Sequence, residues 1–176
     1  MKKLRLLFIG SLIAMMAFIA IAAVAGLMMD ANHAVTREAV YSRSPEEIWS
    51  VITRFDETPT WRSDVQSVRI ESGAPVRFVE LGGQGPLPLE VTEHDAPRRL
   101  VLMASDLDLP FSGSWTFELA KVDGGTRLSI TESASIGNPI VRFVSHTFLD
   151  PADMAETYLV DLGRHLGEEV SPQPPP

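Results

Sequence analysis

Apolar residues recur along this chain with different periods, and each period predicts a different kind of structure. Residues 6–29 form an uncharged, largely apolar run. Between residues 66 and 136, apolar and polar residues mostly alternate, which is typical of half-buried β-strands. After residue 137, apolar residues recur about every 3.6 positions, which predicts a helix. We therefore expect an apolar N-terminal helix, an antiparallel sheet, and a C-terminal helix that covers the sheet.

A first strand and two short helices are predicted before the main run of strands. Residues 33–41 are strand-like, and a helix start follows at Ser44. Pro45 occupies the first helical position and Glu47 the third, which is the pattern of a capping box. A second short helix or turn is expected around Trp61.

The alternating runs predict an α+β fold with an antiparallel sheet of about six or seven strands. The last two runs are joined by Asp123-Gly124-Gly125, which suits the positive φ angles of a tight hairpin turn. On the hairpin, the residues expected to face inward are Trp115, Phe117, Leu119, Leu128, Ile130 and Glu132. The strand-like runs are residues 66–72, 77–81, 87–93, 99–104, 114–122 and 126–133.

The long C-terminal helix is expected to be interrupted at Pro151. Proline cannot donate a hydrogen bond to the preceding turn, and it disfavours helical geometry at Asp150. We therefore expect two helical pieces over the sheet, residues 139–149 and 151–167, with a candidate gate at the joint between them. The apolar or semi-apolar stripe of the two pieces is Ile140, Val144, Thr147, Pro151, Met154, Tyr158, Leu162 and His165.

The N-terminal segment, residues 1–29, has two interpretations. Its uncharged part, residues 6–29, exceeds the roughly 30 Å hydrocarbon core of a bilayer when helical, so a retained single-pass anchor fits. Ala20-Ile21-Ala22 and Ala23-Val24-Ala25 have the small-x-small form that signal peptidase reads, so a cleaved signal with a secreted domain also fits. Basic residues before the apolar run place the domain on the exported side in both cases.

Two further features concern the ends of the chain. Ala22 and Gly26 have the small-xxx-small spacing that allows two helices to pack closely, although the oligomeric state stays open. Residues 170–176 are proline-rich and are expected to be a disordered tail. The folded domain is therefore expected over residues 33–169.

Composition excludes several classes of function. Beyond the N-terminal segment, twelve basic residues face twenty-three acidic ones, which argues against nucleic-acid binding. The chain has no cysteine, so disulfides, thiolate metal sites and a cysteine nucleophile are excluded. The four histidines lack metal-ligand spacing. We expect no metal site, no cofactor and no catalytic residues.

Three motifs in order along the chain resemble those of a known superfamily. They are SPEEIWSVITRFDETPTW at residues 44–61, a W-x-F-x-L strand at 115–119, and GGTRLSITE at 124–132. Residues 33–169 are thus similar to the START-related SRPBCC superfamily, and more narrowly to its polyketide cyclase/dehydrase-like branch. The resemblance implies a helix-grip fold, in which a curved sheet wraps the C-terminal helix and leaves a cavity for a hydrophobic ligand.

The expected function is the binding or carriage of a hydrophobic small molecule, lipid-like or isoprenoid-like. Binding would take place beside a membrane in which residues 6–29 anchor the chain. Such binding predicts an apolar cavity of several hundred Å³. A polyketide cyclase or aromatase-like enzyme and a membrane-tethered protein-interaction module are the alternatives. The candidate cavity residues are Trp115, Phe117, Ile130, Glu132, Phe143, Phe148, Tyr158 and Leu162.

These candidates leave two questions open. The aromatic residues fit a solid core as well as they fit a cavity wall. Period two directs Glu132 inward, where it would be an ion-pair partner of Arg77 or Arg142. Without a partner, burial would bias it toward the neutral acid, which could serve as a ligand anchor or as the proton donor of the cyclase-like enzyme. If the strand ends before Glu132, its carboxylate is simply exposed to solvent.

Overall fold

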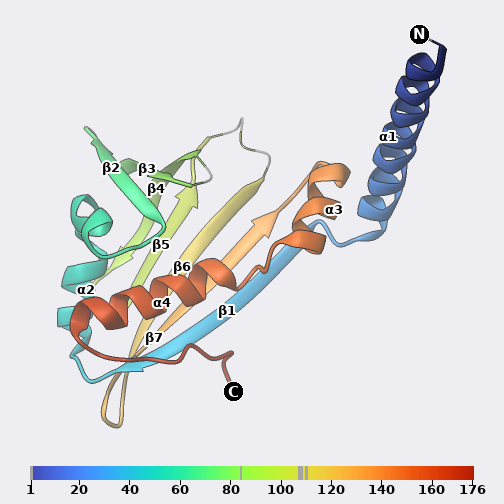
Figure 1. The fold of residues 1–176 in the computed structure, drawn as a ribbon. Helices are drawn as coiled ribbons and strands as arrows, with labels where there is room; N and C mark the ends of the chain where they lie inside the picture. Colours follow the sequence, from blue (N-terminus) through green and yellow to red (C-terminus); the bar gives the residue numbers. More distant parts are fainter. Residues whose placement is uncertain (1, 84, 107–108, 110) are drawn as a thin grey trace.

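The computed structural model describes residues 2–83, 85–106, 109 and 111–176, with side chains from Phe8 onward. Within these residues, seven antiparallel strands form one sheet that curves around a helix (Figure 1). The elements are α1 (Lys2–Met28), β1 (Asn32–Tyr41), α2 (Pro45–Ile52), the 3-10 helix η1 (Phe55–Thr60), β2 (Val65–Glu71), β3 (Arg77–Gly82), β4 (Gly85–Asp95), β5 (Arg99–Ala104), β6 (Ser112–Val122), β7 (Gly125–Ser135), α3 (Pro139–Phe148) and α4 (Asp153–Leu166).

The strand order is β1-β7-β6-β5-β4-β3-β2, so the first strand closes the sheet beside the last one. The β6–β7 hairpin pairs Trp115 with Glu132, and Glu132 pairs in turn with Val35 of β1. Paired residues in neighbouring strands share one face of the sheet. The prediction of an α+β fold with an antiparallel sheet of six or seven strands is therefore confirmed.

The short helices after β1 are also present. The Ser44 hydroxyl accepts a hydrogen bond from the Glu47 amide at 3.3 Å, and the Glu47 carboxylate accepts one from the Ser44 amide at 2.9 Å, which is a complete capping box. The second helix, η1, begins at Phe55, ahead of the expected position at Trp61. Phe55 stacks on Phe78 of β3 with ring centroids 4.3 Å apart, which fastens this turn to the sheet.

The predicted break in the C-terminal helix is confirmed. Helix α3 ends at Phe148, α4 begins at Asp153, and Pro151 lies in the turn between them. Helix α4 lies across the sheet, where the Tyr41 hydroxyl of β1 donates to the Leu159 carbonyl at 2.8 Å. Helix α3 lies at the end of the sheet and makes its main contacts with α1.

Helix α1 extends away from the domain (Figure 1) and presents nearly all of its apolar side chains to its surroundings. Residues Phe8–Met28 are long and apolar enough to cross a membrane, a test that an N-terminal signal sequence also passes. Among the residues of α1 whose side chains are described, Ala22 and Gly26 are buried. They lie on the side of the helix that contacts α3. A Cβ added at Gly26 would lie 1.8 Å from the Pro139 carbonyl oxygen. The small-residue spacing thus packs against a helix of the same chain.

The C-terminal segment runs along β1, although the sequence suggested a disordered tail. Gln173 exchanges two backbone hydrogen bonds with Glu38, at 2.8 and 2.9 Å. Val170 packs against the hydrophobic core. This pairing covers part of the open edge of the sheet, because β1 has no neighbouring strand on that side.

Candidate functional site

A small cavity lies between the sheet and the first turns of α4. Its volume is about 30 Å³, which is room for about one or two water molecules. Among the described residues, the expected cavity of several hundred Å³ is therefore not found between the sheet and α4. Large side chains from the sheet and α4 fill the interior instead. The cavity is lined by Arg62, Glu80, Leu87, Leu89, Leu102, Trp115, Phe117, Ile130, Met154, Ala155 and Tyr158. A hollow of about 520 Å³ lies elsewhere, open to the surroundings at the ends of β1, β5, β6 and β7.

The structure places the predicted site residues in three groups. Four of them line the cavity, namely Trp115, Phe117, Ile130 and Tyr158. Leu162 is fully buried in the adjoining core, and Glu132 lies beside Trp115.

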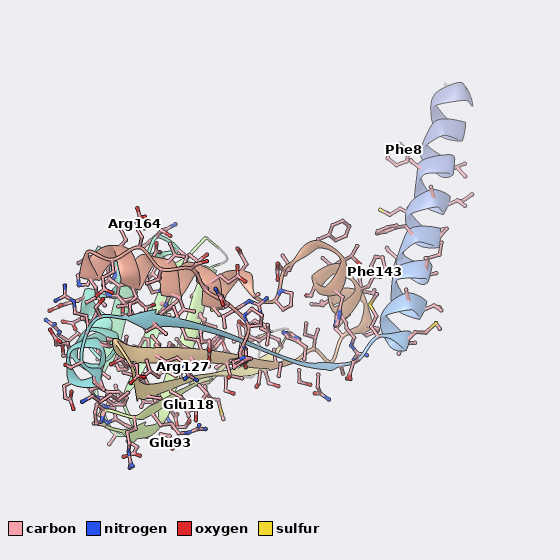
Figure 2. All side chains as sticks on the ribbon, turned by 90° about the horizontal axis from the view of Figure 1, so that it is seen from below. Phe8, Glu93, Glu118, Arg127, Phe143 and Arg164 are labelled. Carbon is pink, nitrogen blue, oxygen red and sulfur yellow. The ribbon has the colours of Figure 1, made fainter. Side chains whose placement is uncertain are left out.

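Phe143 and Phe148 lie elsewhere, because both belong to α3. The Phe143 ring packs edge-on against Phe18 of α1 with centroids 6.4 Å apart, and Figure 2 shows it on the side of α3 toward α1. The Phe148 side chain is exposed. The helix break separates these two residues from the cavity, so both are poor candidates for its wall.

The cavity has a charged end, which sequence reasoning missed. The Arg62 guanidinium follows η1 and donates to both carboxylate oxygens of Glu80, each at 3.0 Å. The same guanidinium pairs with Asp64. Burial raises the pKa of Glu80, and the neighbouring Arg62 lowers it without cancelling the rise. The alternation along β3 could have indicated this ion pair. Glu80 is in phase with the buried Phe78, and a carboxylate that faces inward requires a partner.

Tyr158 of α4 lies against this charged end. The Arg62 guanidinium carbon lies 5.1 Å from the centre of the Tyr158 ring, which is a cation–π contact. The rings of Trp61 and Phe117 pack on the same tyrosine at centroid distances of 5.1 and 5.2 Å. Burial raises the pKa of the Tyr158 hydroxyl, while Arg62 lowers it. Among the described residues, this hydroxyl has no hydrogen-bond partner.

A second unpaired donor lies next to it. The indole Nε1 of Trp61 is enclosed and has no hydrogen-bond partner among the residues that the structure describes. A buried donor without a partner costs about 1–3 kcal/mol. Of these two donors only the Tyr158 hydroxyl belongs to a residue that lines the cavity, whereas Trp61 lies behind Tyr158.

Glu132 faces inward, as its strand period predicts. Its carboxylate accepts a hydrogen bond from the Trp115 indole Nε1 at 3.1 Å. Burial raises the pKa of Glu132, and the Trp115 hydrogen bond lowers it in part. Neither suggested arginine partner reaches it, because Arg77 pairs with Glu90 and Arg142 binds backbone carbonyls.

A buried carboxylate holds α4 against the loop that carries Arg62. Asp161 of α4 accepts hydrogen bonds from the Ser63 amide at 2.6 Å and the Ser63 hydroxyl at 2.7 Å. Burial raises the pKa of Asp161, but these bonds and one from Arg164 outweigh it and hold the pKa below its usual range. The charged end of the cavity is therefore fixed from both sides, by β3 and by α4.

Comparisons with known proteins support the same fold. Residues 32–156 match the family described as polyketide cyclase / dehydrase and lipid transport. A search among curated proteins finds no match.

Solved structures with this fold include enzymes and other proteins. A START superfamily protein from Mycobacterium smegmatis is 17% identical with a TM-score of 0.59, covering 77% of this chain and 97% of that one. Norcoclaurine synthase from Thalictrum flavum is 11% identical with a TM-score of 0.63, covering 77% and 94%. A major latex-like protein from Panax ginseng is 11% identical with a TM-score of 0.61, covering 77% and 95%.

The family match covers more than half of the chain, and the sheet wrapped on α4 is the fold that the motifs implied. At these identities the solved structures establish the fold alone. Its fold is similar to that of the START superfamily protein. The chain belongs to the polyketide cyclase / dehydrase and lipid transport family.

Proposed function

We propose that this protein binds a hydrophobic small molecule between the sheet and α4. The observation that carries the proposal is the cavity itself, which has apolar walls and one polar end formed by Arg62, Glu80 and Tyr158. An apolar pocket with a few convergent polar groups is the usual form of a small-molecule site. The family's association with lipid transport agrees with it.

The charges at the polar end favour a neutral ligand. Arg62 is already paired with Glu80 and Asp64, so the group of three carries one net negative charge when ionised. A ligand carboxylate or phosphate would be repelled there, since solvent screens charges only weakly in a buried site. The Tyr158 hydroxyl, which lines the cavity, fits a ligand hydroxyl or carbonyl oxygen. A long-chain alcohol, a sterol or an isoprenoid alcohol has this chemistry.

Binding of such a ligand requires the cavity to widen. Met154 and Ala155 line it from the first turn of α4, immediately after the joint at residues 149–152. An outward movement of this turn enlarges the cavity without breaking the Asp161–Ser63 contacts near the other end of the helix. The joint at Pro151 thus acts as the hinge in this proposal.

Quenching of Trp115 fluorescence tests the proposal. A long-chain alcohol carrying a bromine atom on its chain is titrated into the full-length protein, beside a brominated fatty acid of equal length. We expect saturable quenching by the alcohol, weaker quenching by the acid at neutral pH, and loss of the quenched component in Trp115→Phe. Tyr158→Phe should reduce the preference for the alcohol. Absence of saturable quenching by either compound would refute the proposal.

A cyclase-like enzyme remains the second candidate because polar groups do converge at the cavity. Arg62, Glu80 and Tyr158 meet there, although Glu132, the residue expected for this role, does not line it. Proton transfer by Glu80 would require a ligand oxygen within hydrogen-bond distance of its carboxylate. Recovery of a bound compound unchanged after prolonged incubation favours binding, whereas a cyclised product favours the enzyme.

We also propose that α1 is a retained membrane anchor with the domain on the exported side. Ala22 is 1% exposed because α3 covers it, and Arg142 donates to the carbonyls of Gly26 and Met29 at the end of α1. Cleavage after Ala22 or Ala25 would remove Phe18, which packs on Phe143, together with the buried Ala22. The intact mass of the protein from its own membranes tests this, since a mass without the first 22 to 25 residues would show a cleaved signal.

A further inference from the structure

Helix α3 is amphipathic with its apolar side facing away from the domain. Arg142 is the one buried residue among its ten. Ile140, Val144 and Phe148 recur every four residues on one side and are 36%, 41% and 69% exposed. A surface helix of a water-soluble domain normally turns its apolar side to the core. This helix does the reverse.

The charged residue of α3 points to the protein side, where backbone carbonyls accept its hydrogen bonds. The Arg142 guanidinium donates to the backbone carbonyls of Ile136, Gly26 and Met29 at 2.8 to 3.1 Å. The last two lie at the end of α1, where helix carbonyls lack the usual partner four residues on, although the Gly26 carbonyl also accepts from the Met29 amide at 3.3 Å. Carbonyls near hydrocarbon require such internal partners. What α3 presents outward is therefore almost entirely uncharged.

Helix α3 lies against the last turns of α1. Pro139 contacts Gly26, and the Phe143 ring contacts Phe18. Eleven residues separate Phe18 from Met29, which is about 16 Å along a helix and about half of a hydrocarbon core. Both contacts on α1 fall within the apolar segment Phe8–Met28. A bilayer crossed by α1 would therefore contain α3 as well, in the leaflet nearer the domain.

We infer that α3 is embedded in that leaflet and that its stripe of Ile140, Val144 and Phe148 contacts lipid acyl chains. The inference rests on the proposed anchoring by α1. The occupant is the bilayer because the stripe continues the exposed apolar surface of α1 and because the only Arg, Lys, Asp or Glu residue of α3, Arg142, is buried. With ten residues, α3 is too short to cross the membrane and enters one leaflet only.

This arrangement sets the domain directly on the membrane. Leu149, at the start of the joint to α4, directly follows Phe148 and is 56% exposed. Met154 and Ala155, which line the cavity, come next along the chain. A hydrophobic ligand leaving the bilayer would thus meet the movable first turn of α4 without crossing water.

Nitroxide labels on single cysteines test the inference, because the native chain has no cysteine. The full-length variants Val144→Cys and Phe148→Cys are reconstituted in phosphatidylcholine vesicles and labelled. Leu12→Cys on α1 reports the anchor, and Ile70→Cys, exposed on β2, reports the aqueous domain. Collision rates are measured with oxygen, which concentrates in hydrocarbon, and with a water-soluble nickel chelate.

We expect the oxygen-to-chelate ratio at positions 144 and 148 to be several-fold higher than at position 70 and close to that at position 12. If the ratio at position 12 indicates lipid but the ratios at 144 and 148 equal that at position 70, then α1 is in the membrane, α3 is not, and the inference fails. If position 12 also matches position 70, the anchor and the inference fail together. Spin–spin broadening at 144 and 148 without a raised ratio would mean that a second copy covers the stripe, which also overturns the inference.

Discussion

At the scale of single residues, the polar end of the cavity contains an ion pair, and the alternation of apolar and polar residues along β3 predicts only one of its two partners. The pattern places Glu80 inward, but nothing in the residues before β2 shows that Arg62 reaches it across 18 positions. The inward direction of Glu132 could be predicted, whereas its partner, the Trp115 indole, depends on the register of the hairpin. The period of a strand predicts which face of the sheet a side chain lies on. The pairing between strands determines which side chains it contacts there.

Replacement of Arg62 by methionine should destabilise the fold by about 3–5 kcal/mol, because Glu80 would remain buried without its partner. Urea unfolding measures the change. The double variant Arg62→Met/Glu80→Met should recover most of the loss, since it leaves no buried carboxylate unpaired and the Asp64 side chain is 37% exposed to solvent. Arg69→Met, at an exposed position on β2, is the matched control. Equal losses in the single and double variants would show that packing, and not the unpaired charge, sets the cost.

Glu132→Gln should make stability less dependent on pH. Burial raises the folded-state pKa of Glu132 above 4.5, so the native protein loses stability as pH rises from that value through the folded pKa. Glutamine does not ionise, so it carries no free-energy cost of burying a charge, and its side-chain oxygen can still accept the hydrogen bond from the Trp115 indole. Between about pH 4 and pH 7, the free energy of unfolding should therefore fall less in Glu132→Gln than in the native protein. Parallel profiles, or the same change in the exposed Glu46→Gln, would contradict this cause.

At the scale of elements, most of the fold followed from local signals. The capping box at Ser44, the hairpin turn before β7 and the break at Pro151 each depend on neighbouring residues, and the structure contains all three. The position of α3 did not follow, because it depends on contact between the two ends of the chain. The spacing of Ala22 and Gly26 indicated a helix partner without identifying it as α3.

Gly26→Leu should separate α1 from α3, since a side chain at Gly26 would collide with the Pro139 carbonyl. The pair Phe18→Cys/Phe143→Cys, introduced into the cysteine-free chain, reports the contact through the yield of a short bifunctional cross-linker. Gly26→Leu should reduce this yield several-fold. Gly10→Leu is the control, because nothing lies within 4 Å of a Cβ at Gly10. Equal yields in the two variants would show that α1 and α3 do not pack in this way.

At the scale of the whole molecule, the chain is a helix-grip domain tied to an apolar N-terminal helix through α3. The class of fold and the position of four cavity residues could be predicted from period and motif. The size of the cavity could not, because it depends on how closely α4 packs on the sheet, and strand or helix period does not report that distance. A filled interior and a ligand cavity have the same apolar pattern.

The measurement that tests the central claim most directly is native mass spectrometry of the full-length protein purified from its own cells. Ala155→Trp fills the cavity from α4, and Val160→Trp places the same side chain on the outer side of α4, where Val160 is 36% exposed. We expect one bound apolar molecule in the native protein and in Val160→Trp, and its loss in Ala155→Trp. An unliganded native protein, or the same bound mass in Ala155→Trp, would contradict it.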